Sequence, residues 1–388
     1  MPLNVGVAGC GDIAQRNYLP GTKQLAGTVD IVATCDAKFP RADQAREDYG
    51  VEECRAYESF PQMLRDSKVE AVEILTPWPL HYPMCLQALQ AGKHVFIQKP
   101  MCQTLAEANT LVEEANRRGL VLVAAPPSMI SPTMQRIKTM IQEDVIGKVA
   151  MVFSHSSHDG ATGDGRLTAS EWFFMREAGV WTSLVDMGVY GLHTVTGILG
   201  PARRVSAFSG IAYRDRTFFS PEHPEPHQVQ ITAHDNGIVL LDWGEGTVGT
   251  VDGSFTVVAR EGPSLIIYGR KGVISSAGRS GSFRLYQESE GGAYPRGWSL
   301  LDASGAIVTE DGSTSGQRRG GSRVVEQGRP VSGQIAGPSP DVAHWADCIS
   351  RRAKPILSAE HARHVVEIME KAVIASTTGQ AQALTTTF

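Results

Sequence analysis

The chain has 388 residues, of which 42% are hydrophobic and 20% are charged, and its formal net charge is −5. A chain of this length usually divides into two domains, and its ordinary, mildly acidic composition indicates neither a nucleic-acid nor an anionic-membrane partner. No run of about 18 apolar residues predicts a membrane span.

The first 125 residues alternate short apolar runs with helical segments. The chain opens on LNVGVAG without the basic and apolar stretches of a signal peptide, so a cytoplasmic protein is expected. We predict strands at 3–9, 29–36, 71–76, 94–98 and 120–125, and helices at 12–25, 40–48, 60–66, 80–91 and 104–118. Strands that alternate with helices form βαβ units, so we expect an α/β domain over residues 1–126 with a doubly wound parallel sheet.

The pattern changes after residue 126. A helix near 131–146, a strand at 148–156 and a helix near 181–199 are followed by short strands at 204–210, 227–234, 237–243, 246–256 and 264–269. These runs predict an α+β domain over residues 127–388 with an antiparallel or mixed sheet. Residues 310–340 are rich in Gly, Ser and Arg and are expected to form a long mobile loop, before closing helices at 340–352 and 358–377.

The cysteines and histidines show no metal-ligand spacing. Six cysteines are widely spaced without a C-x-x-C pair, and the histidines form no H-E-x-x-H motif. This spacing predicts neither a disulfide framework nor a zinc site. We therefore expect free thiols in a reducing cytoplasm and no metal.

A glycine-rich turn lies between the first predicted strand and the first predicted helix. VAGCGDIA gives the pattern G-x-G-x-x-A at Gly9, Gly11 and Ala14. Gly9 permits the tight turn, and Gly11 lets the backbone approach a pyrophosphate. The first helical residues, Asp12 and Ile13, would supply backbone N–H groups and the positive end of the helix dipole. The turn predicts a dinucleotide site, and the alternative is a tight turn without a ligand.

An acidic residue, Asp36, ends the next predicted strand. A carboxylate there accepts the ribose hydroxyls of NAD and repels the 2′-phosphate of NADP. NAD is therefore the expected cofactor, although Lys38 would soften that repulsion and leaves NADP as the alternative.

Four stretches together resemble the Gfo/Idh/MocA oxidoreductase superfamily, which includes inositol dehydrogenases and glucose–fructose oxidoreductase. They are GVAGCGDIA, TPWPLHYPMCLQALQAGKHVFIQKP from Thr76, DMGVYGLHTVTGILGP from Asp186 and SAEHARHVVEIMEKAVIASTTGQ from Ser358. The resemblance implies an N-terminal Rossmann domain, a C-terminal domain with a predominantly antiparallel open sheet, and a homo-oligomer, either a dimer or a tetramer. It also implies a small carbohydrate as substrate.

The resemblance places Lys99 beside the nicotinamide and a substrate hydroxyl, with Thr76, Pro77, His81 and Gln98 also at the cofactor. A desolvated lysine near a cationic nicotinamide would have a lowered pKa, which suits it to exchange a proton with a carbinol. Relatives usually have Glu-Lys-Pro, and Gln98 replaces that glutamate here. The alternative for Lys99 is an exposed surface lysine.

An acid, a phenol and an imidazole interrupt the apolar helix predicted near 181–199. Asp186, Tyr190 and His193 have the spacing i, i+4 and i+7, which lies on one face of an α-helix. Unpaired burial of polar groups is costly, so hydroxyls of a bound substrate are suitable partners. The resemblance implies that Asp186 orients a sugar hydroxyl and that Tyr190 or His193 shares acid–base work with Lys99. His193 is alternatively a core histidine with satisfied hydrogen bonds.

Trp172 precedes this helix in the segment EWFFMREAG. An indole stacks well on apolar C–H surfaces, so Trp172 is a candidate to flank the nicotinamide or a sugar. A buried core tryptophan is the alternative.

Three functions remain open from the sequence. The main hypothesis is an NAD-dependent oxidoreductase that moves a hydride between a nicotinamide and a hydroxyl carbon of a sugar, polyol or glycoside, with Lys99 as the base. A second is an NAD-dependent glycoside hydrolase that works by transient oxidation, elimination, hydration and re-reduction, with Tyr190 and His193 as additional acid–base groups. A third is a non-catalytic sensor or scaffold, which the replacement at Gln98 suggests.

Overall fold

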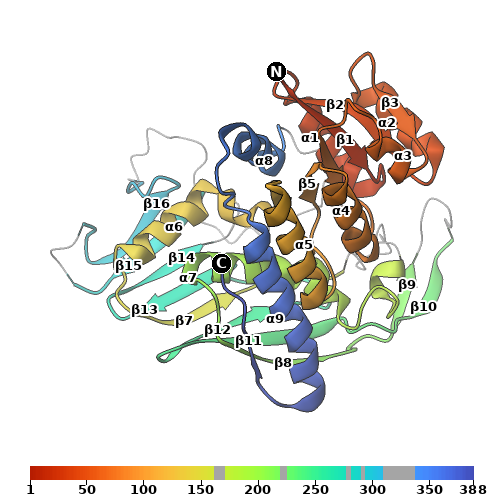
Figure 1. Cartoon of the computed structure of the whole chain (residues 1–388). Helices are drawn as coiled ribbons and strands as arrows, with labels where there is room; N and C mark the ends of the chain where they lie inside the picture. The colour runs from red at the N-terminus through yellow and green to blue at the C-terminus, as the bar shows by residue number, and fades with distance from the viewer. Residues whose placement is uncertain (161–170, 219–224, 277–280, 290–292, 309–336) are drawn as a thin grey trace.

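The computed structural model describes residues 1–160, 171–218, 225–276, 281–289, 293–308 and 337–388 (Figure 1). The described residues form a parallel sheet in the N-terminal part, and a large mixed sheet and a two-stranded hairpin in the rest of the chain. Residues 310–336 of the expected loop lie outside the described residues.

Six parallel strands form the N-terminal sheet, in the order β3-β2-β1-β4-β5-β6. They are β1 (Leu3–Ala8), β2 (Val29–Cys35), β3 (Arg55–Tyr57), β4 (Ala71–Ile74), β5 (His94–Ile97) and β6 (Leu122–Ala124). The strand order reverses between β1 and β4, and ligands of such sheets bind beyond the carboxyl ends of the strands at that point. The predicted α/β fold with a doubly wound sheet is confirmed.

Helical segments connect these strands, and their ends follow the local sequence. They are η1 (Ala14–Tyr18), α1 (Leu19–Lys23), α2 (Phe39–Tyr49), α3 (Phe60–Leu64), η2 (Trp78–Leu80), α4 (His81–Gln90) and α5 (Leu105–Arg118). The Thr104 side chain and the Glu107 side chain form a capping box at the start of α5, and Gly119 ends it in the left-handed conformation. The first helix differs from expectation, because η1 is a π-helical turn that continues into α1.

The second sheet has nine strands in the order β16-β15-β14-β13-β7-β12-β11-β8-β17. They are β7 (Val149–Ser154), β8 (Arg204–Gly210), β11 (Asn236–Gly244), β12 (Thr247–Asp252), β13 (Leu265–Gly269), β14 (Gly272–Ser276), β15 (Ser282–Gln287), β16 (Gly297–Asp302) and β17 (Gln382–Ala383). Only β7 and β12 pair in parallel in this described sheet, so the predicted mostly antiparallel sheet is confirmed. A separate hairpin pairs β9 (Asp215–Phe218) with β10 (His227–Gln230).

Helices cover one face of this second sheet (Figure 1). They are α6 (Pro132–Gln142), the π-helical turn η6 (Leu184–Gly188) with its continuation α7 (Val189–Leu199), and α9 (Ala359–Thr378). Inward-facing side chains such as Val152, Val239 and Ile267 are fully buried. The hydrophobic core of the second domain therefore lies between the sheet and these helices.

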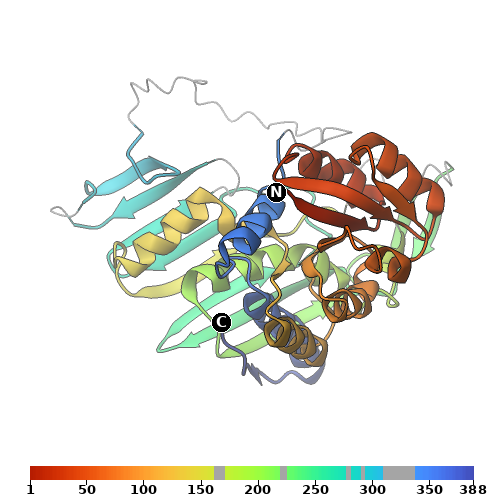
Figure 2. The same ribbon diagram turned by 45° about the horizontal axis from the view of Figure 1, so that its top comes forward.

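Helix α8 (Pro340–Arg351) packs against the first domain, although it follows the second in sequence (Figures 1 and 2). The Trp345 ring lies 6.0 Å from the Phe96 ring of β5. The backbone N–H of Ser339 donates to the carbonyl of Gly21 at 3.2 Å. The predicted boundary at residue 126 stays a prediction, and these contacts favour counting α8 with the first domain.

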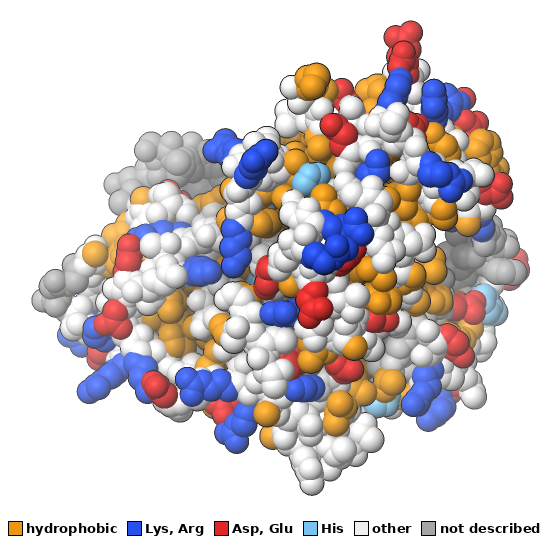
Figure 3. Space-filling view, viewed as in Figure 1, with side chains coloured by type: hydrophobic (Ala, Val, Ile, Leu, Met, Phe, Trp, Pro, Cys, Tyr) orange, Lys and Arg blue, Asp and Glu red, His pale blue; other side chains and the backbone are white. Residues whose placement is uncertain are grey.

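The surface charges, the apolar character of the helices and the state of the cysteines complete the description of the fold. Basic and acidic side chains are interspersed on the face seen in Figure 3. No helix in the described ranges is both long and apolar enough to cross a membrane. All six cysteines are buried and form no disulfide.

Candidate active site

The glycine-rich turn adopts the geometry that its residues require. Gly9 has φ +91°, and a Cβ there would lie 2.8 Å from the backbone carbon of Leu75. Its N–H donates to the carbonyl of Cys35 at 2.8 Å, which ties the turn to the end of β2. A Cβ on Gly11 would meet nothing within 4 Å. The turn thus needs glycine at position 9 for packing, while position 11 leaves open the space beside the start of the first helix.

Asp36 lies beside this turn at the carboxyl end of β2. Its Oδ2 accepts the backbone N–H of Cys10 at 2.9 Å, and its Oδ1 accepts that of Lys38 at 2.8 Å. Asp12 is exposed and forms an ion pair with Arg16. The open space at Gly11, the helix start and a half-buried carboxylate fit a dinucleotide with free ribose hydroxyls.

The residues after β4 lie at the same carboxyl edge of the parallel sheet as the glycine-rich turn and Asp36. Thr76 and Pro77 follow the strand, and His81 lies buried below them. The His81 ring contacts the carbonyl of Pro100 through Nδ1 at 2.6 Å and the carbonyl of Thr76 through Nε2 at 2.8 Å. Burial lowers the pKa of His81 to about 4, so the ring is neutral near neutral pH. His81 therefore joins the two loops rather than facing a ligand.

Lys99 extends from the end of β5 to the second domain. Its Nζ lies 2.5 Å from Oδ1 and 2.7 Å from the carbonyl of Asp186, and 5.2 Å from the centre of the Tyr190 ring. The Lys99 side chain is only 13% exposed. The structure thus brings Lys99, Asp186 and Tyr190 together, and Lys99 is not an exposed surface lysine.

The contact with Asp186 acts against the expected lowering of the Lys99 pKa. Burial acts to lower it, but the charges of Asp186 and Tyr190 and the hydrogen bond to Asp186 outweigh burial and raise the pKa. The expected lowering concerns a desolvated lysine beside a cationic nicotinamide, and it did not include a carboxylate in direct contact. Sequence spacing could not place Asp186 at hydrogen-bond distance.

Gln98 connects Lys99 to two residues that the sequence did not suggest. The N–H of Lys99 donates to Gln98 Oε1 at 2.7 Å, and Gln98 Nε2 donates to the hydroxyl of Tyr18 at 2.8 Å. The Tyr18 hydroxyl donates to Oδ2 of Asp341 on α8 at 3.0 Å. Tyr18 and Asp341 are 323 positions apart, and no sequence signal joins them.

His193 lies away from this group. Its ring packs edge-on against His361 of α9, with 4.8 Å between ring centres. Burial, and to a lesser extent His364, lowers the pKa of His193 to about 3. In the described part of the chain no hydrogen bond joins His193 to Lys99, Asp186 or Tyr190. This environment favours the core-histidine alternative.

Trp172 packs on the segment that follows Thr76. It lies in η5 (Glu171–Phe174), and its ring centre is 4.4 Å from that of Trp78. Trp78 is buried and donates from Nε1 to the carbonyl of Ala178 at 2.6 Å. Trp172 is half-buried, so part of its ring remains available beside the loop that follows β4.

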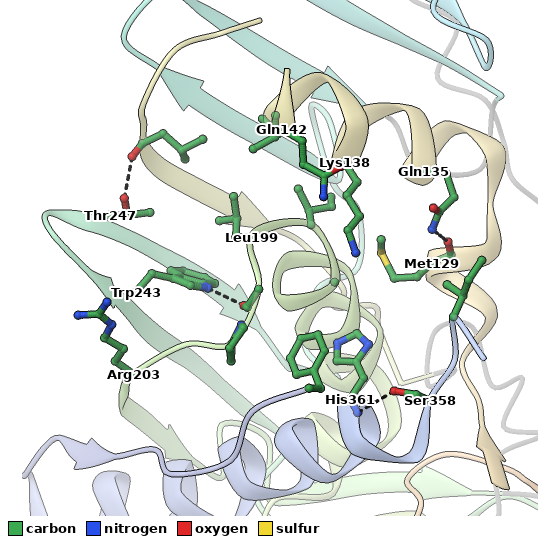
Figure 4. Close-up of a pocket in the computed structure, with 18 of the residues that line it drawn as sticks. Met129, Gln135, Lys138, Gln142, Leu199, Arg203, Trp243, Thr247, Ser358 and His361 are labelled. Carbon is green, nitrogen blue, oxygen red and sulfur yellow. Dashed lines mark hydrogen bonds between the residues drawn. The ribbon is translucent and has the colours of Figure 1, made fainter. Parts of the chain in front are cut away.

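A cavity of about 790 Å³ lies at the other end of α7 (Figure 4). Lys138, Trp243, Ser358 and His361 are among its lining residues, and none of the predicted site residues lines it. Because Asp186 precedes α7 and the cavity surrounds its last turn, this cavity is separate from the Lys99 site. Among the described residues, no three His, Cys, Asp or Glu side chains form a group that could hold a metal ion.

Family models match both domains of the chain. Residues 3–125 match the model described as "Oxidoreductase family, NAD-binding Rossmann fold", and residues 134–275 match the GFO/IDH/MocA C-terminal domain. A crystal structure of an NAD binding oxidoreductase from Klebsiella pneumoniae has a TM-score of 0.79 over 99% of this chain and 100% of that chain. At 20% sequence identity, this likeness concerns the fold alone.

Two curated relatives are similar over about half of the chain. A dTDP-3,4-didehydro-2,6-dideoxy-alpha-D-glucose 3-reductase from Streptomyces violaceoruber is 32% identical over 52% of this chain and 56% of its own length. A D-apiose dehydrogenase from Paraburkholderia graminis is 30% identical over 52% of this chain and 53% of its own length. The chain thus spans about half the length of the curated relatives it matches. With matching models for both domains, the chain belongs to the GFO/IDH/MocA oxidoreductase family and has the NAD-binding Rossmann fold of that family.

Proposed function

We propose that this protein is an NAD-dependent dehydrogenase that acts on a hydroxyl carbon of a sugar, polyol or glycoside. The observation that carries the proposal is the position of Lys99 Nζ, at the carboxyl end of β5 and within 2.5 Å of Asp186 in the second domain. The lysine thus lies where the cofactor edge of the parallel sheet meets the other domain.

The residues divide the work as follows. The bound nicotinamide supplies the acceptor or donor of the hydride. Neutral Lys99 takes the proton of the substrate hydroxyl in the oxidation direction, and protonated Lys99 returns it in the reduction direction. Asp186 holds Lys99 Nζ and offers a second oxygen to a substrate hydroxyl, while the Tyr190 ring stabilises the ammonium through its π face.

Two observations support a carbohydrate as substrate. The similar proteins from Streptomyces violaceoruber and Paraburkholderia graminis are named as a deoxyglucose derivative reductase and an apiose dehydrogenase. Trp172, half-buried against the Trp78 ring, presents aromatic surface next to the loop that follows β4, and indole rings stack on the C–H faces of sugars.

The glycoside hydrolase alternative is not proposed. It was expected to use both Tyr190 and His193 as additional acid–base groups, and His193 instead packs against His361 with a pKa lowered to about 3. The relatives named above are a reductase and a dehydrogenase. The sensor hypothesis lacks support as well, because Lys99, Asp186 and Tyr190 form a connected group.

A panel of aldoses, polyols and aryl glycosides tests the proposal. With NAD in excess, we expect one or more panel members to give NADH and the corresponding keto product in equal amounts. Release of the aryl group without net NADH would instead establish the hydrolase reaction, and deuterium from heavy water would then appear at C2 of the sugar.

We also propose a homo-oligomer that buries the bare face of the second sheet. Cross-strand neighbours on that face carry exposed apolar side chains, and large exposed apolar faces mark interaction sites. They include Met151 at 42%, Val248 at 44%, Phe208 at 72% and Ile238 at 48% exposure. Light scattering should give a dimer or tetramer, and Met151→Glu with Ile238→Glu should give a monomer. A wild-type monomer would refute this proposal.

We propose, finally, that the protein works in the cytoplasm. All six cysteines remain free and buried, which suits a reducing compartment. Fractionation of the source cells would test this location.

A further inference from the structure

A buried chain of hydrogen bonds begins at the main chain of Lys99 and ends on helix α8. It passes from Lys99 N to Gln98 Oε1 at 2.7 Å, from Gln98 Nε2 to the Tyr18 hydroxyl at 2.8 Å, and from there to Asp341 Oδ2 at 3.0 Å. Gln98, Tyr18 and Asp341 are 7%, 6% and 3% exposed. Water does not compete for these groups, so each bond has to be satisfied within the chain.

The donors and acceptors allow only one direction. A backbone N–H can only donate, so Gln98 presents its carbonyl oxygen to Lys99 and its amide N–H groups to Tyr18. The Tyr18 hydroxyl accepts from Gln98 and must donate to Asp341. The second oxygen of Asp341 accepts the N–H of Val342 at 3.1 Å. Both oxygens of Asp341 are therefore acceptors, which is the pattern of a carboxylate.

We propose that Asp341 and Tyr18 are positioning residues for Lys99. Through Gln98 they fix the main chain from which the Lys99 side chain reaches Asp186, so that helix α8 sets the geometry of the proton-transfer group. The inference rests on the proposed function, because it takes Lys99 to be that group. Because residue 98 is an uncharged amide, Asp341 is the only carboxylate in this chain of bonds.

A displacement of a reacting group by about 1 Å can cost a hundredfold in rate, so fixing this main chain has kinetic value. Asp186 fixes Nζ from one side, and the chain to Asp341 fixes the backbone from the other. His81, which contacts the carbonyl of Pro100, holds the next residue of the same loop.

Exchanging the charge between positions 98 and 341 tests the proposal. In Gln98→Glu the introduced carboxylate faces the Tyr18 oxygen, whose only proton already goes to Asp341, so one buried acceptor lacks a donor. In Asp341→Asn the side chain has one acceptor oxygen, although both the Tyr18 hydroxyl and the Val342 N–H need an acceptor. In the double variant the direction reverses: Tyr18 donates to the introduced glutamate, and the introduced asparagine amide donates to Tyr18 while its oxygen accepts from Val342.

Two readouts are needed, and one does not require a substrate. The first is the rate at which limiting acetic anhydride acetylates Lys99, mapped by mass spectrometry. The second is turnover of an oxidised sugar from the panel. We expect each single variant to raise Lys99 labelling several-fold and to lower kcat about tenfold with an unchanged KM for NAD, and the double variant to return within about twofold of wild type.

Thr22→Val is the matched control. The Thr22 hydroxyl donates to Glu73 at 3.0 Å in the same buried layer but takes no part in the chain to Lys99. We expect this variant to melt earlier with unchanged Lys99 labelling and kcat. The proposal is overturned if both single variants label and turn over like wild type, if the double variant is as impaired as the sum of the singles, or if Thr22→Val matches them. If no sugar is oxidised, labelling of Lys99 still decides this inference, while the proposed function fails separately.

Discussion

Replacing Lys99 by alanine removes the ammonium that contacts both Asp186 and the Tyr190 ring. General acid–base groups contribute roughly a hundredfold or more, so turnover should fall by at least about 100-fold. Affinity for NAD, measured by titration calorimetry, should stay within a few fold, because the glycine-rich turn at Gly9 and Gly11, where we expect the phosphates, is untouched. Lys93, just before β5, is the matched control, and Lys93→Ala should keep full turnover. Near-normal rates in Lys99→Ala would remove the lysine from the proposed role.

The second residue-scale prediction concerns pH. Burial lowers and the Asp186 charge raises the pKa of Lys99, with a net rise. The proposed sugar oxidation needs the neutral amine, so kcat/KM should increase with pH until Lys99 has lost its proton. Asp186→Asn removes the charge that raises the pKa while burial remains, so the midpoint of the pH profile should move to lower pH. An unmoved or higher midpoint would contradict the pairing.

The sequence identified Lys99, Asp186 and Tyr190, but it could not find Tyr18 or Asp341. The first three lie in motifs with a recognisable spacing or resemblance. Tyr18 belongs to no motif that we recognised in the sequence, and Asp341 is 323 positions away. Only the packing of α8 brings the two side chains together. His193 has helical spacing to Asp186, yet spacing alone does not indicate that His361 covers it.

At the scale of elements, two substitutions in the turn between β1 and η1 should affect the stability of the protein and its affinity for NAD differently. Gly9→Ala would place a Cβ 2.8 Å from the backbone of Leu75 at φ +91°, so both the melting temperature and NAD affinity should fall. Gly11→Ala meets nothing within 4 Å, so it should melt like wild type but bind NAD more weakly, because the methyl group would enter the space that we expect the pyrophosphate to occupy. Calorimetry and fluorescence titration measure both quantities. Equal NAD binding by Gly11→Ala and wild type would place the dinucleotide elsewhere.

Elements were predicted well where the apolar pattern was long, and less well where it was short. The strands β1, β2, β4 and β5 lie where buried apolar runs predicted them. The π-helical turns η1 and η6 were missed, because apolar periodicity does not distinguish them from an ordinary helix. Asp186 lies within η6, and both its carboxylate and its carbonyl contact Lys99. The strands β15 and β16, at one end of the second sheet, were not predicted individually either, since their short runs contain many polar residues.

For the whole molecule, a buried acid predicts how stability varies with pH. Glu73 is fully buried in β4, and burial raises its pKa to about 8 from the usual 4.5, opposed by the Thr22 hydrogen bond and aided by Asp341. The folded state therefore binds a proton that the unfolded chain has lost, so this contribution is complete below about pH 4.5 and is lost as the pH rises to about 8. Each pKa unit corresponds to about 1.4 kcal/mol, so the loss amounts to a few kcal/mol.

Denaturant unfolding of wild type and Glu73→Gln at several pH values measures this effect. The free energy of unfolding of wild type, relative to the variant, should fall between pH 5 and pH 8 and then level off. The buried histidines, whose pKa values are lowered, change stability in the opposite sense at lower pH, and the comparison with the variant cancels them. Parallel curves for the two proteins would show that Glu73 is ionised in the folded state.

Helix α8 also has a consequence for the order in which the protein is made. It covers Phe96 of β5, yet more than half of the chain is synthesised between that strand and the helix. At about 5–20 residues per second, the nascent cofactor domain waits for ten seconds or more with this apolar face open. Nearly the whole second domain is therefore synthesised before α8 can pack on the first domain. Chaperones that bind nascent chains can bind the uncovered apolar face of the first domain during that interval.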